Sequence, residues 1–294
     1  MSLTLDTART GDTARTETPA FTLEALSPVL GAAVTGLDLR QPLPEATRRA
    51  VYDAFLRYHV LCFRDQRLDA GEQIAFSEQF GTLERHMARN AGAGNPLVNV
   101  VSNLGADGKP SGKVGSTNWH SDKSFRPEPS LATILHAQVM PPEGGETCFA
   151  DMTAAYEALP DAERAALEGV RAIHDFAVSA ALTGRRATAE EIADAPPRAQ
   201  PLVRVIPETK KRALFLGDHA SHIEGRPVEE GRARLAALTA HAVAERFVYR
   251  HAWRMGDLLM WDNRCLLHRA NANFDAAFHP RVLHRTCLRG NAPA

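Results

Sequence analysis

The sharpest chemical signal in the sequence is the segment NWHSDKSF, which contains an H-x-D pair, His120 and Asp122. In an extended segment, residues i and i+2 point to the same face, so an imidazole nitrogen and a carboxylate oxygen can bind one metal ion from adjacent positions. The pair alone is a weak signal, because H-x-D often arises by chance. A surface turn in which Asp122 caps the chain and His120 packs against Trp119 is the alternative.

A third candidate ligand, His268, closes a strand-like run near the C-terminus, in GDLLMWDNRCLLHR. A late strand that returns beside an early one would bring His268 to the H-x-D pair. Two histidines and one carboxylate on one face of an octahedral ion leave the opposite face open, as in non-haem iron(II) oxygenases. Zinc accepts the same ligands but normally prefers a tetrahedral site.

Two arginines, Arg281 and Arg285, follow in RVLHR and stand four residues apart, on one face of a predicted strand. A guanidinium binds a carboxylate bidentately, and its burial is favourable only with an anion as partner. The flanking Val282, Leu283 and Cys287 favour burial, whereas a surface pair on an edge strand is the alternative. We therefore expect this strand to bind an anion.

The composition limits the setting of this chemistry. Among 294 residues, 44% are hydrophobic, and 34 Lys+Arg against 35 Asp+Glu give a formal net charge of -1. No global field would therefore gather the chain onto nucleic acid or an anionic membrane. The four cysteines form no C-x-x-C, which argues against a zinc ribbon, an iron–sulfur cluster or a disulfide scaffold. With no signal peptide and no apolar run of roughly 20 residues, we expect a cytoplasmic protein.

The elements that must position these residues can be read from apolar periodicity. Four segments have the pattern of helices: Pro44–His59, Asp69–Gly81, Met152–Val170 and Pro227–Glu245. Val60–Phe63 and many short apolar runs after Leu97, separated by Gly, Pro and Asp, have the texture of strands. This pattern predicts an α+β, mostly β fold, specifically a jelly roll (double-stranded β-helix) core flanked by helices.

Three further expectations concern organisation. Residues 1–18 lack apolar periodicity and should form a disordered arm, which leaves 19–294 as a single domain. Ala187–Gln200, rich in Ala and Pro, should be a mobile insertion. The long helix over Arg232–Ala244 could supply an isologous surface for a homo-oligomer.

The chain resembles the TauD/TfdA family of iron(II)/2-oxoglutarate-dependent dioxygenases over roughly residues 20–290. The resemblance is densest in WHSDKSF, PPEGGETCFADMTAAYEALP, FLGDHASHIEGRPVEEGR, FVYRHAWRMGDLLMWDNRCLLHR and RVLHRT. These blocks are long and specific. The sequence patterns HASHIEG-P and VYRH-W-GDL-MWDNR-LHR look closer to the 2,4-dichlorophenoxyacetate dioxygenase branch than to the taurine branch.

By this resemblance the chain is an enzyme whose iron(II) is bound by His120, Asp122 and His268. Its cosubstrates would be 2-oxoglutarate and O2, and it would hydroxylate a small anionic organic substrate while releasing succinate and CO2. The favoured substrate is an aryloxyalkanoate-type carboxylate, in which hydroxylation next to the ether oxygen leads to ether cleavage.

The resemblance also implies how 2-oxoglutarate is bound. Thr147, in GGETCF, should donate its hydroxyl to the distal carboxylate, and Arg281 should form a salt bridge with that carboxylate. Arg285 would lie near the C1 carboxylate and the anionic end of the substrate. The interval from His268 to Arg281 is slightly longer than in the relatives, which leaves open which arginine does what.

Substrate contacts are implied by position in the family pattern. Loops at 85–95 and 182–200 shape the pocket and cannot be placed from the sequence. For His86 and Arg89 the alternative is a solvated basic loop. For His219 and His222, in the HASH segment, it is a structural turn. The implied residues are His86 and Arg89 in FGTLERHMARN, Ser116 where the taurine branch has an asparagine, His219 and His222 in GDHASHIEG, and Arg285.

Two other functions compete with this interpretation. The first is a dioxygenase acting on taurine, another sulfonate or an alkylsulfate. The second, from a different class, is a metal-binding jelly-roll sensor without turnover. The presence of Thr147 and Arg281 beside the triad argues against a sensor, which has no need of a 2-oxoglutarate site.

Overall fold

The computed structural model describes residues 21–85, 91–92 and 95–293 of the chain. The arm expected at residues 1–18 lies outside the described residues. So do the two expected substrate residues His86 and Arg89.

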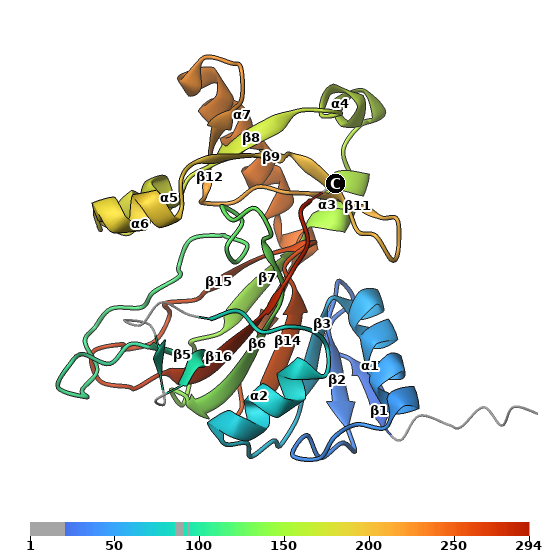
Figure 1. The fold of residues 1–294 in the computed structure, drawn as a ribbon, viewed down its shortest axis with the longest axis vertical. Helices are drawn as coiled ribbons and strands as arrows, with labels where there is room; N and C mark the ends of the chain where they lie inside the picture. Colours follow the sequence, from blue (N-terminus) through green and yellow to red (C-terminus); the bar gives the residue numbers. More distant parts are fainter. Residues whose placement is uncertain (1–20, 86–90, 93–94, 294) are drawn as a thin grey trace, which may run out of the picture.

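Two antiparallel sheets pack face to face and form the centre of the molecule (Figure 1). The smaller one has the order β13 (Val248–His251), β7 (Thr147–Asp151) and β15 (Leu266–Ala270). The only parallel neighbours in the larger one are β2 and β3 among the described strands. In spatial order the larger sheet contains β1 (Thr22–Ala25), β2 (Ala32–Thr35), β3 (Val60–Phe63), β14 (Leu258–Asp262), β6 (Ser130–Val139), β16 (Val282–Arg289), β5 (Asn95–Ser102) and β4 (Ala91–Gly92).

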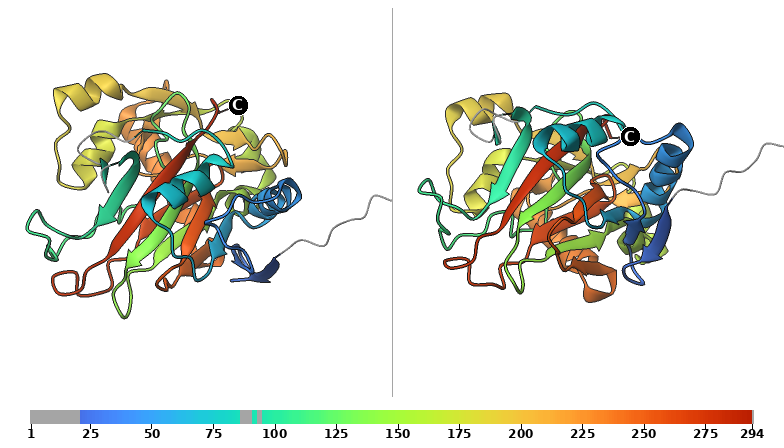
Figure 2. Two further views of the ribbon diagram at one scale, coloured as in Figure 1. Left: turned by 60° about the horizontal axis from the view of Figure 1, so that its bottom comes forward. Right: turned by 90° about the horizontal axis from the view of Figure 1, so that it is seen from below.

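Helices cover the outer face of the large sheet. Figure 2 shows α2 (Ala70–Glu78) lying across β16, while α1 (Glu45–Tyr58) packs beside β3 and β14. The remaining elements form a layer above the sheets in Figure 1. They are α3 (Met152–Glu157), α4 (Asp161–Ala166), β8 (Arg171–His174), α5 (Phe176–Leu182), α6 (Ala189–Asp194), β9 (Arg198–Pro201), β10 (Val203–Val205), β11 (Arg212–Leu214), β12 (Ala220–Ile223), α7 (Val228–Ala242) and a 3₁₀ turn at Glu245–Phe247.

Strand β14 shows why the central strands read as continuous apolar runs. Leu258 and Met260 point to the helices, whereas Leu259 and Trp261 point to the small sheet. All four are buried, because both faces of the sheet are covered. Phe149 of β7 meets Trp261 edge to face at 5.4 Å, so aromatic contacts fix the spacing of the two sheets.

The first two predicted helices are confirmed, and their ends follow from local chemistry. Helix α1 begins after Pro44 and ends at His59, which adopts the left-handed conformation (φ 61°). Asp69 and Glu72 form a reciprocal capping box at the start of α2, which satisfies two otherwise unpaired backbone N–H groups.

Two expectations about local structure were wrong. The single helix expected over Met152–Val170 is two short helices, because Pro160 supplies no N–H for an i→i−4 bond and begins a new helix instead. The mobile insertion expected over Ala187–Gln200 contains α6 and the start of β9. A capping box between Thr188 and Glu191 begins α6, and this start signal was overlooked in the sequence.

The four cysteines, Cys62, Cys148, Cys265 and Cys287, are free thiols with buried side chains. Buried free thiols of this kind pack as small hydrophobic side chains. Among the described residues, no helix is both long and apolar enough to cross a membrane.

The close packing of α7 on β12 gives a prediction with an unusual sign. In a helix, Gly→Ala normally stabilises by about 1 kcal/mol. At Gly231, however, the added methyl carbon would lie 2.5 Å from the backbone nitrogen of Ile223. We expect Gly231→Ala to lower the free energy of unfolding by about 1–3 kcal/mol, measured by urea denaturation. The exposed Ala236 in the same helix is the control: Ala236→Gly should cost about 1 kcal/mol. A Gly231→Ala protein more stable than the native one would contradict this packing.

Candidate active site

A single antiparallel bridge joins the H-x-D segment to strand β15. The backbone N–H of His120 donates to the carbonyl of His268 (3.0 Å), and the N–H of His268 donates back to His120 (2.8 Å). The two imidazole rings therefore lie with their centroids 4.2 Å apart. Two histidines that are 148 positions apart in the sequence thus lie side by side.

The three candidate metal ligands converge on one small, buried space. Asp122 Oδ1 lies 3.9 Å from His120 Nε2, and Asp122 Oδ2 lies 3.8 Å from His268 Nε2. One ligand atom from each residue lies within 4.8 Å of the others. The Nδ1 of His120 faces the carbonyl of Asn118 at 2.9 Å, so it must carry the proton, which leaves the Nε2 lone pair free for a metal.

The electrostatics favour the ligand forms of these side chains. Burial would raise the pKa of the Asp122 carboxyl, but the charge of Arg285 and the hydrogen bond from Thr133 together hold that pKa well below its usual range. Burial keeps the pKa of His268 well below its ordinary value, so its ring is neutral. An ionised carboxylate and neutral imidazoles are the forms that bind a divalent cation.

Polar side chains from the large sheet orient Asp122, and sequence reasoning missed them. Thr133 of β6 donates its hydroxyl to Asp122 Oδ2 (2.6 Å) and accepts from the amide of Asn263 (2.9 Å). The indole N–H of Trp261 donates to Asn263 Oδ1 (3.1 Å). The available signal was the presence of polar Thr133 and Asn263 in or next to apolar strand runs, since buried polar groups require partners.

A second polar group lies nearby, where strand β7 begins. Arg281 donates through Nη2 to the hydroxyl of Thr147 (3.3 Å) and through Nε to the carbonyl of Gly145 (3.0 Å). Asn103 accepts the backbone N–H of Arg281 (2.7 Å) and so fixes the start of β16. The sequence pointed to Thr147 and Arg281, which the structure brings together; Gly145 and Asn103 carried no such signal.

Arg281 has no counter-ion among the described residues. Its side chain is buried, no carboxylate lies within ion-pair distance, and burial alone lowers the pKa of its guanidinium to about 10. A buried cation without an acidic partner is costly unless an anion binds there. This feature fits a carboxylate ligand.

Between the triad and Arg281 lies a small cavity of about 40 Å³. Two more of the expected residues face it: Arg285, whose Nη1 contacts Asp122 Oδ1 at 3.2 Å, and Ser116, which has a left-handed backbone (φ 57°). The full lining is Val101, Gly115, Ser116, His120, Leu135, Thr147, Trp261, His268, Ala270, Arg281 and Arg285.

The two HASH histidines lie in different surroundings. His219 is buried, its ring centroid is 6.5 Å from that of His120, and its Nδ1 contacts the Ser124 hydroxyl at 3.1 Å. His222 lies on β12 beside α7, next to Gly231, and its Nδ1 contacts Ser221. His222 does not line the cavity, so nothing in its placement supports the expected substrate contact.

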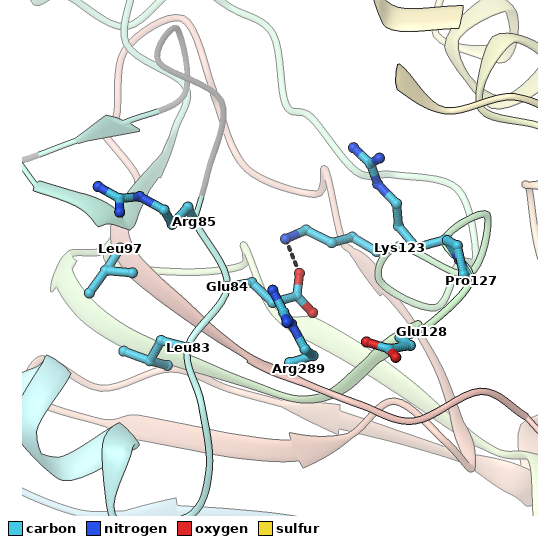
Figure 3. A pocket seen from close by; sticks show the side chains of 9 residues that line it. Leu83, Glu84, Arg85, Leu97, Lys123, Pro127, Glu128 and Arg289 are labelled. Carbon is cyan, nitrogen blue, oxygen red and sulfur yellow. Dashed lines mark hydrogen bonds and ion pairs between the residues drawn. The ribbon is translucent and has the colours of Figure 1, made fainter. Parts of the chain in front are cut away.

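A larger, open groove of about 760 Å³ is lined by Lys123, the residue that follows Asp122 (Figure 3). Lys123 points into it and pairs with Glu84, as the dashed line in Figure 3 shows. Arg85 and Arg289 also line it, with Glu128 among the acids. None of the triad lines this groove, so we place the chemistry in the small cavity.

Comparison with known proteins adds to this geometry. The family described as "Taurine catabolism dioxygenase TauD, TfdA family" matches residues 22–287. The chain is 41% identical over 278 residues to the alpha-ketoglutarate-dependent 2,4-dichlorophenoxyacetate dioxygenase of Burkholderia sp. (strain RASC), covering 90% of this chain and 93% of the relative. It is 35% identical over 271 residues to the (S)-phenoxypropionate/alpha-ketoglutarate-dioxygenase of Sphingobium herbicidovorans, covering 86% and 90% of the two chains.

Solved structures show the same fold. The crystal structure of AAD-2 in complex with Mn(II) and N-oxalylglycine is similar with a TM-score of 0.84 and 39% identity, covering 92% of this chain and 99% of that one. A taurine dioxygenase from Burkholderia xenovorans is similar with a TM-score of 0.79 and 31% identity, covering 94% and 91%. The predicted jelly roll flanked by helices is thereby confirmed.

The geometry around Asp122 predicts how metal affinity should depend on its hydrogen bonds. We expect Mn(II) to bind the purified protein at one site and Asp122→Ala to abolish that binding. Thr133→Val removes the bond to Asp122 Oδ2 and should weaken binding ten- to a hundredfold, measured by calorimetry. Thr286→Val is the matched control, because Thr286 is equally buried in the same sheet but bonds to Ser77, on the helix side. Equal losses in both variants would contradict a role of Thr133 in orienting the ligand.

Proposed function

The chain belongs to the TauD/TfdA family of 2-oxoglutarate-dependent dioxygenases, and from that premise we propose that it oxidises a small aryloxyalkanoate-type carboxylate, with cleavage of the ether bond. The observation that carries the proposal is a pair of arginines that line the cavity, Arg281 directly before β16 and Arg285 within it. Arg281 has no acidic partner, and Arg285 reaches the proposed metal ligand Asp122.

We assign iron(II) to His120, Asp122 and His268. The donor set fits, because it offers two imidazole nitrogens and one ionised carboxylate, all within 4.8 Å of one another. Iron(II) with 2-oxoglutarate supplies the oxidising chemistry when bound: O2 is consumed, 2-oxoglutarate becomes succinate and CO2, and a substrate carbon is hydroxylated. The protein's own contribution is positioning, charge compensation and the exclusion of water.

We assign Arg281 and Thr147 to the distal carboxylate of 2-oxoglutarate. Both are buried, both face the cavity beside the triad, and Arg281 is held rigidly by Gly145 and Asn103. A guanidinium and a hydroxyl that converge on one point make charge-assisted hydrogen bonds to a carboxylate. The cosubstrate would thus span the distance from this pair to the metal.

We assign Arg285 to the anionic end of the substrate, beside the C1 carboxylate of 2-oxoglutarate. One of its nitrogens, Nη1, contacts Asp122, while its Nε is buried without a partner among the described residues. An arginine has five N–H donors, so Arg285 can keep its contact with Asp122 and still bind a second carboxylate.

The rest of the substrate contacts are proposals of the same kind. Val101, Leu135 and Trp261 offer apolar surface that suits an aromatic ring, and Ser116 offers a hydroxyl. His219 lies close enough to His120 to face a substrate that approaches the metal. His86 and Arg89 stay assigned by resemblance alone.

The substrate class can be tested by competitive turnover. We expect the protein with iron(II) and 2-oxoglutarate to convert phenoxyacetate-type acids, with phenol and succinate released in equal amounts. Taurine and short alkylsulfonates should react more slowly, because a third sulfonate oxygen without a donor is costly. Arg285→Met should impair phenoxyacetate turnover through a raised KM. Faster release of sulfite than of phenol would favour the sulfonate alternative instead.

The cosubstrate assignment predicts graded losses. Arg281→Ala should weaken 2-oxoglutarate binding by on the order of 3–5 kcal/mol, because a buried carboxylate loses its ionic partner. That is more than a hundredfold in affinity. Thr147→Val removes one hydrogen bond to the anion and should cost about 1–3 kcal/mol. The measurement is calorimetry with Mn(II) in place of iron. A large defect in Arg285→Ala together with a normal Arg281→Ala would mean that the two arginines exchange roles.

A further inference from the structure

Trp253 has no role in the proposed function, yet it contacts Thr147 in the proposed cosubstrate site. Trp253 follows strand β13 and lies two residues beyond His251, which is the register partner of Thr147 on β7. The indole N–H of Trp253 donates to the hydroxyl oxygen of Thr147 over 3.0 Å. The side chain of Trp253 is half-buried and does not line the cavity itself, but it contacts Thr147, which does.

The hydrogen bonds around Thr147 leave its hydroxyl only one role. A threonine hydroxyl has two acceptor lone pairs and one proton to donate. Trp253 Nε1 and Arg281 Nη2 can only donate, and both donate to the Thr147 oxygen, at 3.0 and 3.3 Å. Both lone pairs are therefore in use. The hydroxyl proton has no acceptor among the described residues, so it is available to a ligand that accepts hydrogen bonds.

The position of Trp253 is itself fixed by buried groups. Its ring meets that of His251 edge to face, at 4.9 Å and 86°. His251 is held on one side by the Tyr249 hydroxyl (2.8 Å) and on the other by Asp257 (3.1 Å). Asp257 in turn accepts from Arg64 (2.7 Å) and is almost completely buried. An indole held in this way cannot turn its N–H elsewhere without breaking the contact with His251.

We propose that Trp253 is a positioning residue for 2-oxoglutarate: its N–H fixes the Thr147 hydroxyl as a donor aimed at the distal carboxylate. The proposal rests on the assignment of Thr147 and Arg281 to that carboxylate. Without the indole N–H, one lone pair of the hydroxyl is free, and the hydroxyl can rotate away from the geometry that suits a carboxylate. Preorganised donors bind an anion more tightly than donors that must be ordered on binding.

The test compares Trp253→Phe with substitutions at Thr147, with the dissociation constant of 2-oxoglutarate measured by calorimetry on the Mn(II)-loaded protein. Phenylalanine offers an aromatic ring to His251 and removes the N–H donor together with part of the indole ring, a loss of packing that the Thr147→Val background controls for. We expect Trp253→Phe to weaken 2-oxoglutarate binding about three- to tenfold, the typical effect of one hydrogen bond. With iron and saturating 2-oxoglutarate, kcat should stay near the native value, because the substitution acts through cosubstrate affinity.

Two backgrounds separate positioning from general damage to the site. In Thr147→Ser the hydroxyl remains, so Trp253→Phe should still weaken binding by a similar factor. In Thr147→Val the hydroxyl is absent, so adding Trp253→Phe should change the dissociation constant less than twofold. A loss of equal size in the Thr147→Val background, or no loss in the native background, would overturn the proposal.

The same series distinguishes this inference from the function on which it rests. If Thr147→Val binds 2-oxoglutarate like the native protein, the assignment of Thr147 to the cosubstrate fails. If Thr147→Val weakens binding and Trp253→Phe does not, that assignment stands and only the role of Trp253 fails.

A second readout needs neither metal nor cosubstrate. The chain has three tryptophans, so its ¹⁵N spectrum should show three indole N–H signals. Trp253→Phe identifies the Trp253 signal by its loss. Thr147→Val should move that signal, since its acceptor is gone, and Thr147→Ser should leave it nearly in place. A Trp253 signal that is unaffected by Thr147→Val would show that the hydrogen bond is absent.

Discussion

The site is governed by the cost of burying charge between two apolar sheets. Two guanidinium groups, Arg281 and Arg285, and one carboxylate, Asp122, face the same interior. An arginine stays protonated at any ordinary pH, so its burial is tolerable only beside an anion. Asp122 forms an ion pair with Arg285, whereas no acidic side chain among the described residues pairs with Arg281. The ligand-free protein therefore keeps an excess positive charge at one end of the cavity, which supports the proposed binding of a dicarboxylate there.

The buried polar atoms around these charges need hydrogen-bond partners, and strands of both sheets supply them. The large sheet contributes Thr133 and Arg285 from adjacent strands, β6 and β16, while the small sheet contributes His268 and Thr147. Because alternate residues of a strand point to opposite faces, β6 and β16 of the large sheet can present polar groups inward while their outward residues pack under the helices on the other face. The bonds from Thr133 to Asp122 and from Trp253 to Thr147 show the same principle: each functional oxygen is oriented by a donor or acceptor on another strand or loop.

Local signals in the sequence were reliable where a local interaction decides the structure. The apolar run of strand β3 and the helix that starts after Asp69 can be recognised from neighbouring residues, and both elements were predicted. The errors have equally local causes. Pro160 interrupts an otherwise helical pattern at 152–170, and the Thr188 capping box begins a helix in a segment whose Ala and Pro content indicated an insertion. His222 shows a different limit: its place against α7 depends on how a helix packs on β12, which periodicity does not reveal.

Strand geometry alone suggested that His120 shares a face with Asp122, and Arg281 with Arg285, because these pairs are two and four residues apart. The family resemblance was needed to join them with His268 and Thr147 as one candidate site. The sequence could not show that Arg285 contacts Asp122 while Arg281 has no acidic partner, nor that Trp253 donates to Thr147. The two contacts join residues 163 and 106 positions apart. Contacts of this range are set by sheet register and by the packing of one sheet on the other, since a register shift of a single residue would turn every inward side chain outward.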